Sequence, residues 1–251
     1  MIKTFHFPLA IIFSLGIYIF GASQELRSRE MVEFSSFFID KTEVTIAQFA
    51  RFKADTNIVT KAEKKGGGLV YENGWERKKG WFWNSPYGEE GSLDEPAVHV
   101  TYDEASQYCK WAGKRLPTDA EWISAAYTEQ RNFPSVPFQA GRTYTFPVGD
   151  QPNGANCLTD CGYSPTIDFS KYLTRGYGHE RVAVTKAGVN GLYDMGANVW
   201  EWVDTKSTAS KGTRGGSWWY GKEQMKVNYV ASKPRGMSAV YIGFRCAKDK
   251  N

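Results

Sequence analysis

The sequence predicts a single α+β domain with little regular secondary structure, and three observations support this class. Two helix-capping sequences, Thr101-Tyr-Asp-Glu104 and Thr118-Asp-Ala-Glu121, both lie in the first half of the chain. From residue 131 onward Gly, Pro, Asn and aromatic residues dominate, which is typical of short strands joined by turns. Third, aromatic residues make up 15% of the 251 residues and there are 25 Gly, which indicates a loop-rich fold held together by large rings.

The overall composition excludes several classes of protein. With 41% hydrophobic and 23% charged residues, the chain is globular rather than intrinsically disordered. The formal net charge is only +4 and the charged side chains are scattered, so we expect no nucleic-acid partner. Three His in the whole chain leave almost nothing for a His-based metal site.

The first 23 residues have the pattern of a secretory signal peptide. The basic residue Lys3 precedes an apolar run over residues 7–22, which ends in small residues. A membrane anchor is the alternative, but a helix that spans a bilayer needs about 20 residues and this run is shorter. We therefore expect cleavage after residues 1–23 and an exported protein, periplasmic or secreted, with no transmembrane span left. Disulfides persist in such a compartment.

Residues 24–36 are expected to form an N-terminal leader ahead of a domain that covers residues 37–251. Its first element is a strand over residues 37–40. Thr45 can cap a helix whose apolar face carries Ile46, Phe49 and Phe52. Residues 64–95 hold three Trp among Gly and Pro, and we expect a long aromatic loop with weak strands there.

Thr101 and Thr118 each open a further helix. The first helix ends at Gly113, and its apolar face carries Ala105, Tyr108, Cys109 and Ala112. The second helix carries Trp122, Ala125 and Ala126. His99 stands in an alternating run and is predicted to be a strand residue rather than a ligand, whereas His179 falls in a loop.

Several sequence motifs occur in a fixed order along the chain. They are residues 38–45 (Phe-Ile-Asp-Lys-Thr-Glu-Val-Thr), 96–102 (Pro-Ala-Val-His-Val-Thr-Tyr), 108–122 (Tyr-Cys-Lys-Trp-Ala-Gly-Lys-Arg-Leu-Pro-Thr-Asp-Ala-Glu-Trp), 190–195 (Asn-Gly-Leu-Tyr-Asp-Met), 198–202 (Asn-Val-Trp-Glu-Trp), 214–218 (Arg-Gly-Gly-Ser-Trp) and 242–247 (Ile-Gly-Phe-Arg-Cys-Ala). In their order and spacing, over roughly residues 36–247, these motifs resemble the formylglycine-generating enzyme (sulfatase-modifying factor) family.

This resemblance implies a formylglycine-generating-enzyme fold, a single α+β domain related to C-type-lectin-like domains. In the family, calcium ions and a disulfide help to stabilise the fold. The best-known members oxidise a Cys of a newly made sulfatase to Cα-formylglycine, using O2 and a copper ion held by two thiolates. Other members carry out different oxidative chemistry and some have no activity, so the fold alone does not define the activity.

The family places its two reactive thiols three and eight residues after the Ser of the Arg-Gly-Gly-Ser motif. Those positions are occupied by Tyr220 and Met225 in this chain. A phenol whose ordinary pKa is about 10 and a neutral thioether do not replace two thiolates. We therefore expect neither copper binding nor Cys-to-formylglycine oxidation by the family mechanism, as in a pseudoenzyme.

The four Cys are enough for two disulfides. The resemblance pairs Cys109 with Cys246. Cys157 and Cys161 lie in a Gly-rich loop, and their spacing is not a zinc signature. A local disulfide is the simplest interpretation of this second pair. A redox-active or metal-binding pair and two separate free thiols are the alternatives.

Three residues match the substrate pocket of the family. Trp200 and Ser217 correspond to residues that flank the reacting sulfur, and Lys233 stands near a position where the family often has Arg. An aromatic wall and a hydroxyl suit the binding of an extended peptide or a small polar ligand. Core packing is the alternative for Trp200. Together with Tyr220 and Met225, these residues are the pocket candidates.

The resemblance also implies structural calcium. The residues that match one family site, through side-chain or backbone oxygens, are Asp194, Ala197, Val199 and Glu201. Oxygen-only ligation is what Ca2+ prefers. The alternative is a solvated Asp and a buried Glu that is hydrogen-bonded to backbone. A second site would begin at Asn156, where Asp160 or Asp168 would have to replace a missing downstream Asp.

Three classes of function remain open at this point. The first is a role in sulfatase maturation or sulfatase binding without the family thiols, with a sulfatase or another exported protein segment as partner. The second is an O2-dependent oxidase of another specificity, built on residues around Trp200, Ser217 and Tyr220. The third is a non-catalytic binding or structural module of the cell envelope.

Overall fold

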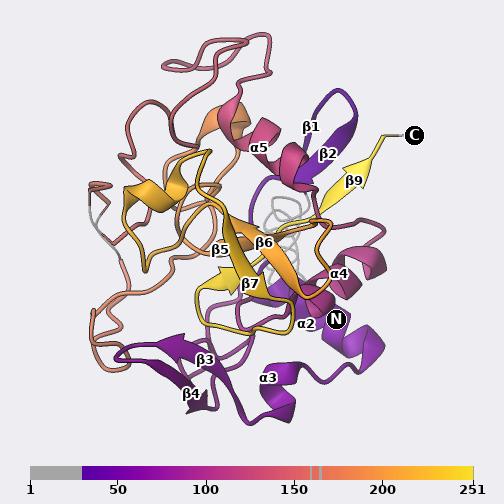
Figure 1. Ribbon diagram of the computed structural model, residues 1–251, viewed down its shortest axis with the longest axis vertical. Helices are drawn as coiled ribbons and strands as arrows, with labels where there is room; N and C mark the ends of the chain where they lie inside the picture. The colour runs from indigo at the N-terminus through magenta and orange to yellow at the C-terminus, as the bar shows by residue number, and fades with distance from the viewer. Residues whose placement is uncertain (1–29, 159, 164–165, 251) are drawn as a thin grey trace, which may run out of the picture.

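The computed structural model describes residues 30–158, 160–163 and 166–250 (Figure 1). The predicted signal peptide and residues 24–29 of the predicted leader lie outside the described residues. Among the residues that are described, no helix is long and apolar enough to cross a bilayer. The elements are short and are joined by long irregular segments, so the low regular content expected from the sequence is confirmed.

A three-stranded antiparallel sheet joins the two ends of the described chain. It has the order β1 (Met31–Glu33), β2 (Phe37–Asp40) and β9 (Ala247–Asp249), with Val32 paired to Ile39 and Ile39 to Ala247. The predicted strand over residues 37–40 is confirmed. Because β1 precedes β2 and pairs with it, the fold begins within the segment that the sequence suggested was only a leader.

The second sheet lies at the centre of the molecule and has four strands in the order β7-β6-β5-β8 (Figure 1). Their bounds are β5 (Trp200–Val203), β6 (Ser210–Arg214), β7 (Ala231–Pro234) and β8 (Ile242–Gly243). Strand β5 is buried along its whole length and pairs parallel to β8, while the other two pairs are antiparallel. This sheet carries Trp200 and Lys233 on strands β5 and β7.

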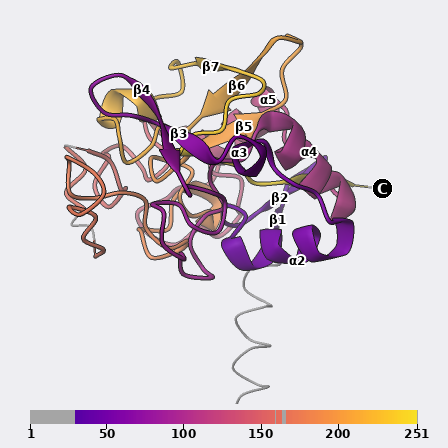
Figure 2. The same ribbon diagram turned by 90° about the horizontal axis from the view of Figure 1, so that it is seen from below.

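The segment predicted as a long aromatic loop with weak strands, residues 64–95, follows a helical turn and contains a hairpin. The turn is α3 (Lys61–Lys64), and the hairpin consists of β3 (Gly67–Tyr71) and β4 (Trp75–Lys79). Figures 1 and 2 show the hairpin beside the four-stranded sheet, and a single bridge from Leu69 to Ala239 connects the two. The weak strands expected there are present, but the sequence pattern did not define their bounds, because strand β4 is mostly exposed and charged and lacks the alternation of a half-buried strand.

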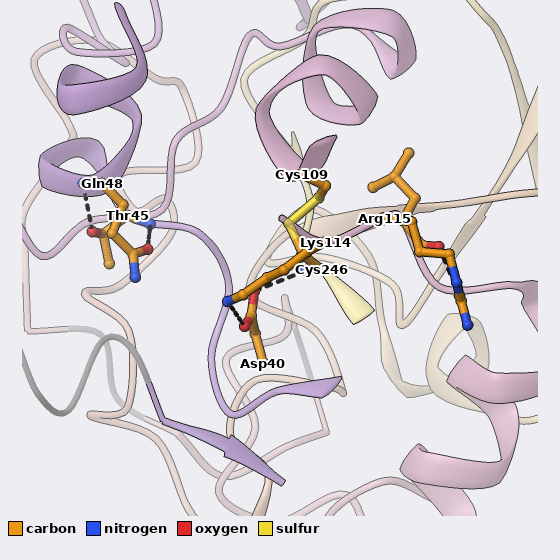
Figure 3. The surroundings of a disulfide bond; sticks show 8 residues. Asp40, Thr45, Gln48, Cys109, Lys114, Arg115 and Cys246 are labelled. Carbon is orange, nitrogen blue, oxygen red and sulfur yellow. Dashed lines mark hydrogen bonds and ion pairs between the residues drawn. A yellow bond between two sulfur atoms is a disulfide. The ribbon is translucent and has the colours of Figure 1, made fainter. Parts of the chain in front are cut away.

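Three longer helices begin where the sequence predicted them. They are α2 (Ile46–Thr56), α4 (Tyr102–Trp111) and α5 (Asp119–Tyr127), and each starts at a complete capping box formed by Thr45, Thr101 or Thr118. The box at Thr45 uses Gln48, which receives the backbone N–H of Thr45 at 2.8 Å (Figure 3). Helix α2 buries Ile46, Phe49 and Phe52, as predicted. Two short 3-10 turns, η1 (Val189–Gly191) and η2 (Lys222–Met225), complete the elements of the residues that the structure describes.

Large rings fill the interior of the domain, as the composition suggested. Four Trp are almost completely buried, namely Trp122, Trp200, Trp202 and Trp218. Phe49 packs on Tyr108 of helix α4, with ring centroids 5.8 Å apart, and joins α2 to α4. These rings replace the continuous helices and sheets that organise the core of a more regular fold.

His99 is not a strand residue, which corrects the prediction. Its backbone lies in the left-handed region with φ 56°, in a bend, and its side chain is fully buried. The imidazole fills the space beside Gly68 of strand β3, where a Cβ atom would lie only 1.9 Å from Nδ1. Its Nε2 atom lies 2.9 Å from the carbonyl oxygen of Pro86. Burial lowers the pKa of His99 to about 4, so this side chain is neutral and structural.

Candidate functional site

Most of the predicted pocket residues lie at one cluster of aromatic rings. The aromatic cluster consists of Tyr71, Trp75, Trp200, Trp219, Tyr220, Tyr229 and Tyr241. Ring centroids lie 5.6 Å apart for Trp200 and Tyr220, 6.3 Å for Tyr220 and Tyr241, and 6.2 Å for Tyr241 and Trp75. Strand β5, the segment after Ser217 and the β3–β4 hairpin therefore meet at this cluster.

The cluster is partly open to solvent. Trp200 and Tyr241 are buried, whereas Trp75 is 52% exposed, Tyr71 43% and Tyr229 37%. Tyr220 is half-buried between these two groups. The rings at the base are buried and those at the rim are accessible to solvent, an arrangement that suits ligand binding better than a wholly buried core does.

Tyr220 supplies a neutral phenol at the first of the two family thiol positions. Burial raises the pKa of this phenol above its usual value, and the neighbouring Tyr229 adds to that effect. The positive charge of Arg175 acts in the opposite direction. Tyr220 therefore stays protonated at neutral pH, and it has neither the charge nor the softness of a thiolate.

Met225, at the second thiol position, lies in different surroundings. It is completely buried in a small apolar cluster with Phe146, Ala197 and the second Cys pair. Its sulfur lies 3.7 Å from Sγ of Cys161. Cys157 and Cys161 form a disulfide, which confirms the simplest interpretation of that pair. Because Cys109 and Cys246 also form a disulfide, no Cys of the chain is free.

Ser217 belongs to the turn that presents Trp219 and Tyr220. Its side chain is almost fully buried, and Oγ accepts the backbone N–H of Trp219 at 3.3 Å. Among the described residues this is the one hydrogen bond to Oγ, so Ser217 has no His or Asp that could activate it as a nucleophile. The turn depends on Gly215 at φ 93°, where a Cβ atom would lie 2.7 Å from the carbonyl oxygen of Met195.

Two cationic side chains flank the aromatic cluster. Nζ of Lys233, on strand β7, lies 5.0 Å from the centroid of Trp200. The guanidinium carbon of Arg175 lies 3.6 Å from the centroid of Trp219. Lys233 was predicted as a pocket residue from the sequence, but Arg175 and Tyr241 were not, because neither lies within a recognised motif and only the fold brings them together.

Two of the residues predicted to hold calcium, Glu201 and Asp194, lie near the buried cation of Arg245. Glu201, on strand β5, accepts bidentate hydrogen bonds from Arg245 at 2.6 and 2.7 Å, and Trp122 Nε1 donates to it at 2.8 Å. Asp194 is buried and accepts the backbone N–H of Ala183. Arg245 therefore supplies positive charge beside Glu201, and a calcium ion there would have to share or displace this contact. Calcium at this position stays a prediction.

Asn156 is the first residue of the other predicted calcium site. Its side chain is completely buried, and Nδ2 donates to the carbonyl oxygen of Gly178 at 3.1 Å. Its Oδ1 atom forms no hydrogen bond with any described residue, so this oxygen is available to bind a cation or a water. Asp160 and Asp168 are exposed and form their contacts with Lys222 and Ser170 instead. This site also stays a prediction.

Glu43 makes the stability of this acidic centre depend on pH. The carboxyl group is buried, and burial together with the negative charges of Asp194 and Glu201 raises its pKa well above the usual range. In the unfolded chain Glu43 titrates near its ordinary pKa of about 4.3. The folded state therefore holds a proton that the unfolded state loses, and stability falls as the pH rises from about 4.3 toward the folded pKa.

We expect Glu43→Gln to remove this loss. Relative to the wild type, the variant should gain up to about 1.4 kcal/mol per pH unit over this window, because one proton is no longer taken up on folding. Urea unfolding of both proteins at a series of pH values measures the difference. Parallel pH profiles for the two proteins would show that Glu43 does not titrate in this way.

The disulfide between Cys109 and Cys246 confirms the pairing implied by the family resemblance. It ties helix α4 to the segment between β8 and β9 across a sequence separation of 137 residues (Figure 3). Lys114 forms an ion pair with Asp40 close to this bridge, and Asp40 accepts the backbone N–H of Cys246. The bridge thus lies where helix α4, strand β2 and the C-terminal segment meet.

The fold and the site together define a class: a disulfide-linked α+β domain with few regular elements and an aromatic site that lacks thiols. A family model described as the sulfatase-modifying factor enzyme 1-like domain matches residues 4–250. The chain therefore belongs to this family.

Individual relatives agree with this assignment. The formylglycine-generating enzyme of Thermomonospora curvata is 30% identical over 273 residues, which cover 87% of this chain and 84% of the relative. The inactive Cα-formylglycine-generating enzyme 2 of Mus musculus is 29% identical over 257 residues, which cover 90% and 79%. The family thus includes both an enzyme and an inactive protein that have similar sequence identity to this chain.

Solved structures confirm the fold. The structure of PvdO from Pseudomonas aeruginosa superposes with a TM-score of 0.57 at 18% identity, covering 85% of this chain and 80% of PvdO. The crystal structure of CarF gives a TM-score of 0.56 at 19% identity, with 86% and 87% covered. At these identities the likeness concerns the fold alone.

Proposed function

We propose that this chain is an exported, non-oxidising member of the sulfatase-modifying factor family that binds a segment of another exported protein, such as a sulfatase. The binding site is the aromatic cluster. One observation carries the proposal: Tyr220 stands among accessible rings at a position where the family has a reactive thiol, while every Cys of this chain is in a disulfide.

The chemistry of the cluster supports binding rather than oxidation. A thiolate is needed to hold Cu(I), and neither Tyr220 nor Met225 supplies one. Exposed Trp and Tyr side chains above a buried aromatic base are typical of the residues that contribute most to protein–protein binding. The inactive relative from mouse supports the proposal, because loss of the family's activity has an example at a similar degree of identity.

Export rests on the N-terminal sequence and on the disulfides. The pattern of residues 1–23 is that of a signal peptide, and both disulfides would be stable outside the cytoplasm. A partner in the same compartment is therefore another exported chain.

The proposal predicts the result of an activity assay. Purified protein is incubated with Cu(I), O2 and a peptide that carries a sulfatase Cys motif, and the peptide is analysed by mass spectrometry. We expect the Cys to stay unmodified, because no thiolate can hold the metal. Conversion of the Cys side chain to an aldehyde by the wild-type protein, but not by heat-unfolded protein, would refute the non-oxidising assignment.

The binding part is tested with Trp75→Ser and, as matched control, Phe133→Ser. Both residues are exposed aromatics, at 52% and 96%, but Phe133 lies outside the aromatic cluster. Peptides that tile the surface and active-site segments of a sulfatase are titrated against each protein by fluorescence anisotropy. We expect Trp75→Ser to weaken binding about tenfold or more, as for a residue central to an interface, and Phe133→Ser to leave it unchanged. Equal affinities for all three proteins would place the binding surface elsewhere.

A further inference from the structure

The aromatic cluster and its base hold buried hydrogen-bond donors that have no acceptor. Trp200 and Tyr241 are at most 1% exposed, yet Nε1 of Trp200 and Oη of Tyr241 form no hydrogen bond with the described part of the chain. Nε1 of Trp218, whose ring packs on Trp219, is likewise buried and has no hydrogen-bond partner among the described residues. An indole N–H can only donate, and a buried donor left unpaired costs about 1–3 kcal/mol. These indole N–H and phenol O–H groups therefore lack a hydrogen-bond acceptor.

The two cations beside the cluster lack an acidic partner as well. Neither Lys233 nor Arg175 forms an ion pair with any residue in the described ranges. Other shielded cations of this protein do have carboxylate partners: Lys53 pairs with Glu63, Lys211 with Asp204 and Arg214 with Asp119. Burial alone lowers the pKa of Lys233, which means that its positive charge is desolvated without compensation.

The ring contacts place these donors and cations in one continuous arrangement. Arg175 lies over Trp219, whose ring centroid is 6.3 Å from that of Tyr241. Tyr241 in turn contacts Tyr220, and Tyr220 contacts Trp200, over which Lys233 lies. The two cations thus lie at the two ends of a row of rings that includes Tyr220 and the rings of the two buried donors. The indole N–H groups can only donate and both side chains at the ends of the cluster are positive, so the ligand group that complements them is an anionic acceptor; Tyr241 Oη can donate or accept, and Oε1 of Glu72, next to Tyr71 in the chain, is a further buried oxygen without a partner among the described residues.

We propose that the aromatic cluster binds an oxyanion, a carboxylate, sulfate or phosphate group, between Lys233 and Arg175. Lys233 offers a compact ammonium group, and Arg175 offers planar N–H donors, one of which already bonds to the carbonyl oxygen of Trp219 at 2.5 Å. The buried rings at the base of the cluster strengthen such charge-assisted bonds. Two sources supply such an oxyanion: a free inorganic ion or an acidic group of a polypeptide. In the second case the inference rests on the proposed function and names the chemical group that the cluster recognises in its partner.

The first experiment measures the binding of inorganic oxyanions to the protein. Sodium sulfate and sodium phosphate are titrated into the full chain by isothermal calorimetry, with sodium chloride at matched ionic strength as reference. We expect saturable binding of sulfate or phosphate, and an affinity about tenfold lower in Lys233→Met and in Arg175→Gln, with Lys233→Arg retaining binding. Lys171→Met is the matched control, because Nζ of Lys171 also lies 5.0 Å from a ring centroid, that of Tyr172, but pairs with Glu89. We expect it to bind like the wild type.

The second experiment separates the two sources of the oxyanion and the two proposals. A bound acidic peptide is compared with the same peptide in which each Glu and Asp is replaced by Gln and Asn. Loss of binding on this replacement, with competition by sulfate, supports a polypeptide carboxylate at the site. Saturable sulfate binding without any peptide binding supports the oxyanion site and contradicts the proposed function.

Sulfate and phosphate that bind no more tightly than chloride, together with peptide binding that is insensitive to the loss of carboxylates, would refute the oxyanion site. In that case peptide binding that is still weakened by Trp75→Ser would leave the proposed function intact. Equal loss of sulfate binding in Lys171→Met and Lys233→Met would also refute the site, because it would indicate non-specific attraction to positive charge.

Discussion

Arg245→Met is expected to lower the free energy of unfolding by about 3–5 kcal/mol, the largest effect of any single substitution that we predict. Arg245 is completely buried, and it makes both hydrogen bonds of a bidentate pair with Glu201. It also donates to the carbonyl oxygens of Asp40 and Tyr193. Its removal leaves Glu201 without its cation in a centre that already holds Glu43 and Asp194.

The measurement is urea unfolding at neutral pH, with Arg115→Met as matched control. Arg115 also forms a bidentate pair, with Glu121, but both side chains are partly exposed, so we expect a loss of about 1 kcal/mol or less. In the double variant Arg245→Met, Glu201→Gln the loss should be smaller than in Arg245→Met alone, because no buried charge is then left at position 201. A loss in Arg245→Met no greater than in Arg115→Met would contradict a central role for this ion pair.

Removal of the Cys109–Cys246 disulfide by Cys109→Ser, Cys246→Ser is expected to lower stability by about 4–5 kcal/mol. The bridge closes a sequence separation of 137 residues, so its loss greatly increases the conformational entropy of the unfolded chain. Both sulfurs are buried, and the replacement also inserts two hydroxyl groups into the core beside helix α4.

The second disulfide provides the control. Cys157 and Cys161 are separated by only four residues, and the same entropy argument gives about 2 kcal/mol for Cys157→Ser, Cys161→Ser. Thermal and urea unfolding of the two double variants, compared with the wild type under non-reducing conditions, measure both losses. A ranking in the reverse order would show that strain or local packing, and not loop length, determines the contribution of each bridge.

Local features of the fold were predictable wherever a short stretch of sequence determines its own structure. Thr45, Thr101 and Thr118 cap their helices through partners three residues away, so each start could be recognised without knowledge of the rest of the molecule. Strand β1 was missed, and the β3–β4 hairpin was expected only as weak strands without defined bounds. Strand β4 is mostly exposed, and β1 is short and pairs only with an adjacent strand, so neither has a distinct hydrophobic period.

The candidate site was predictable only in part, for a similar reason. Trp200 and Ser217 lie in family motifs, and Tyr220 follows at a fixed spacing, so these residues could be named from the sequence. Tyr220 and Met225 were expected to share a site, but in the structure Tyr220 lies in the aromatic cluster and Met225 lies in the apolar cluster around Cys161. A separation of five residues says little about which side chains face the same way in an irregular segment.

The amino-acid sequence was sufficient to recognise the family, with the Cys109–Cys246 pairing that it implies, the helix starts and the absence of thiols at the two reactive positions. Each of these depends on residue identity at fixed local spacing or on a motif order. The tertiary structure decided that Arg245 compensates Glu201, that Trp75 from a hairpin joins Tyr241, and that Lys233 and Arg175 flank one cluster without acidic partners. These pairings join segments distant in the chain, and only packing in three dimensions sets which charges and rings meet.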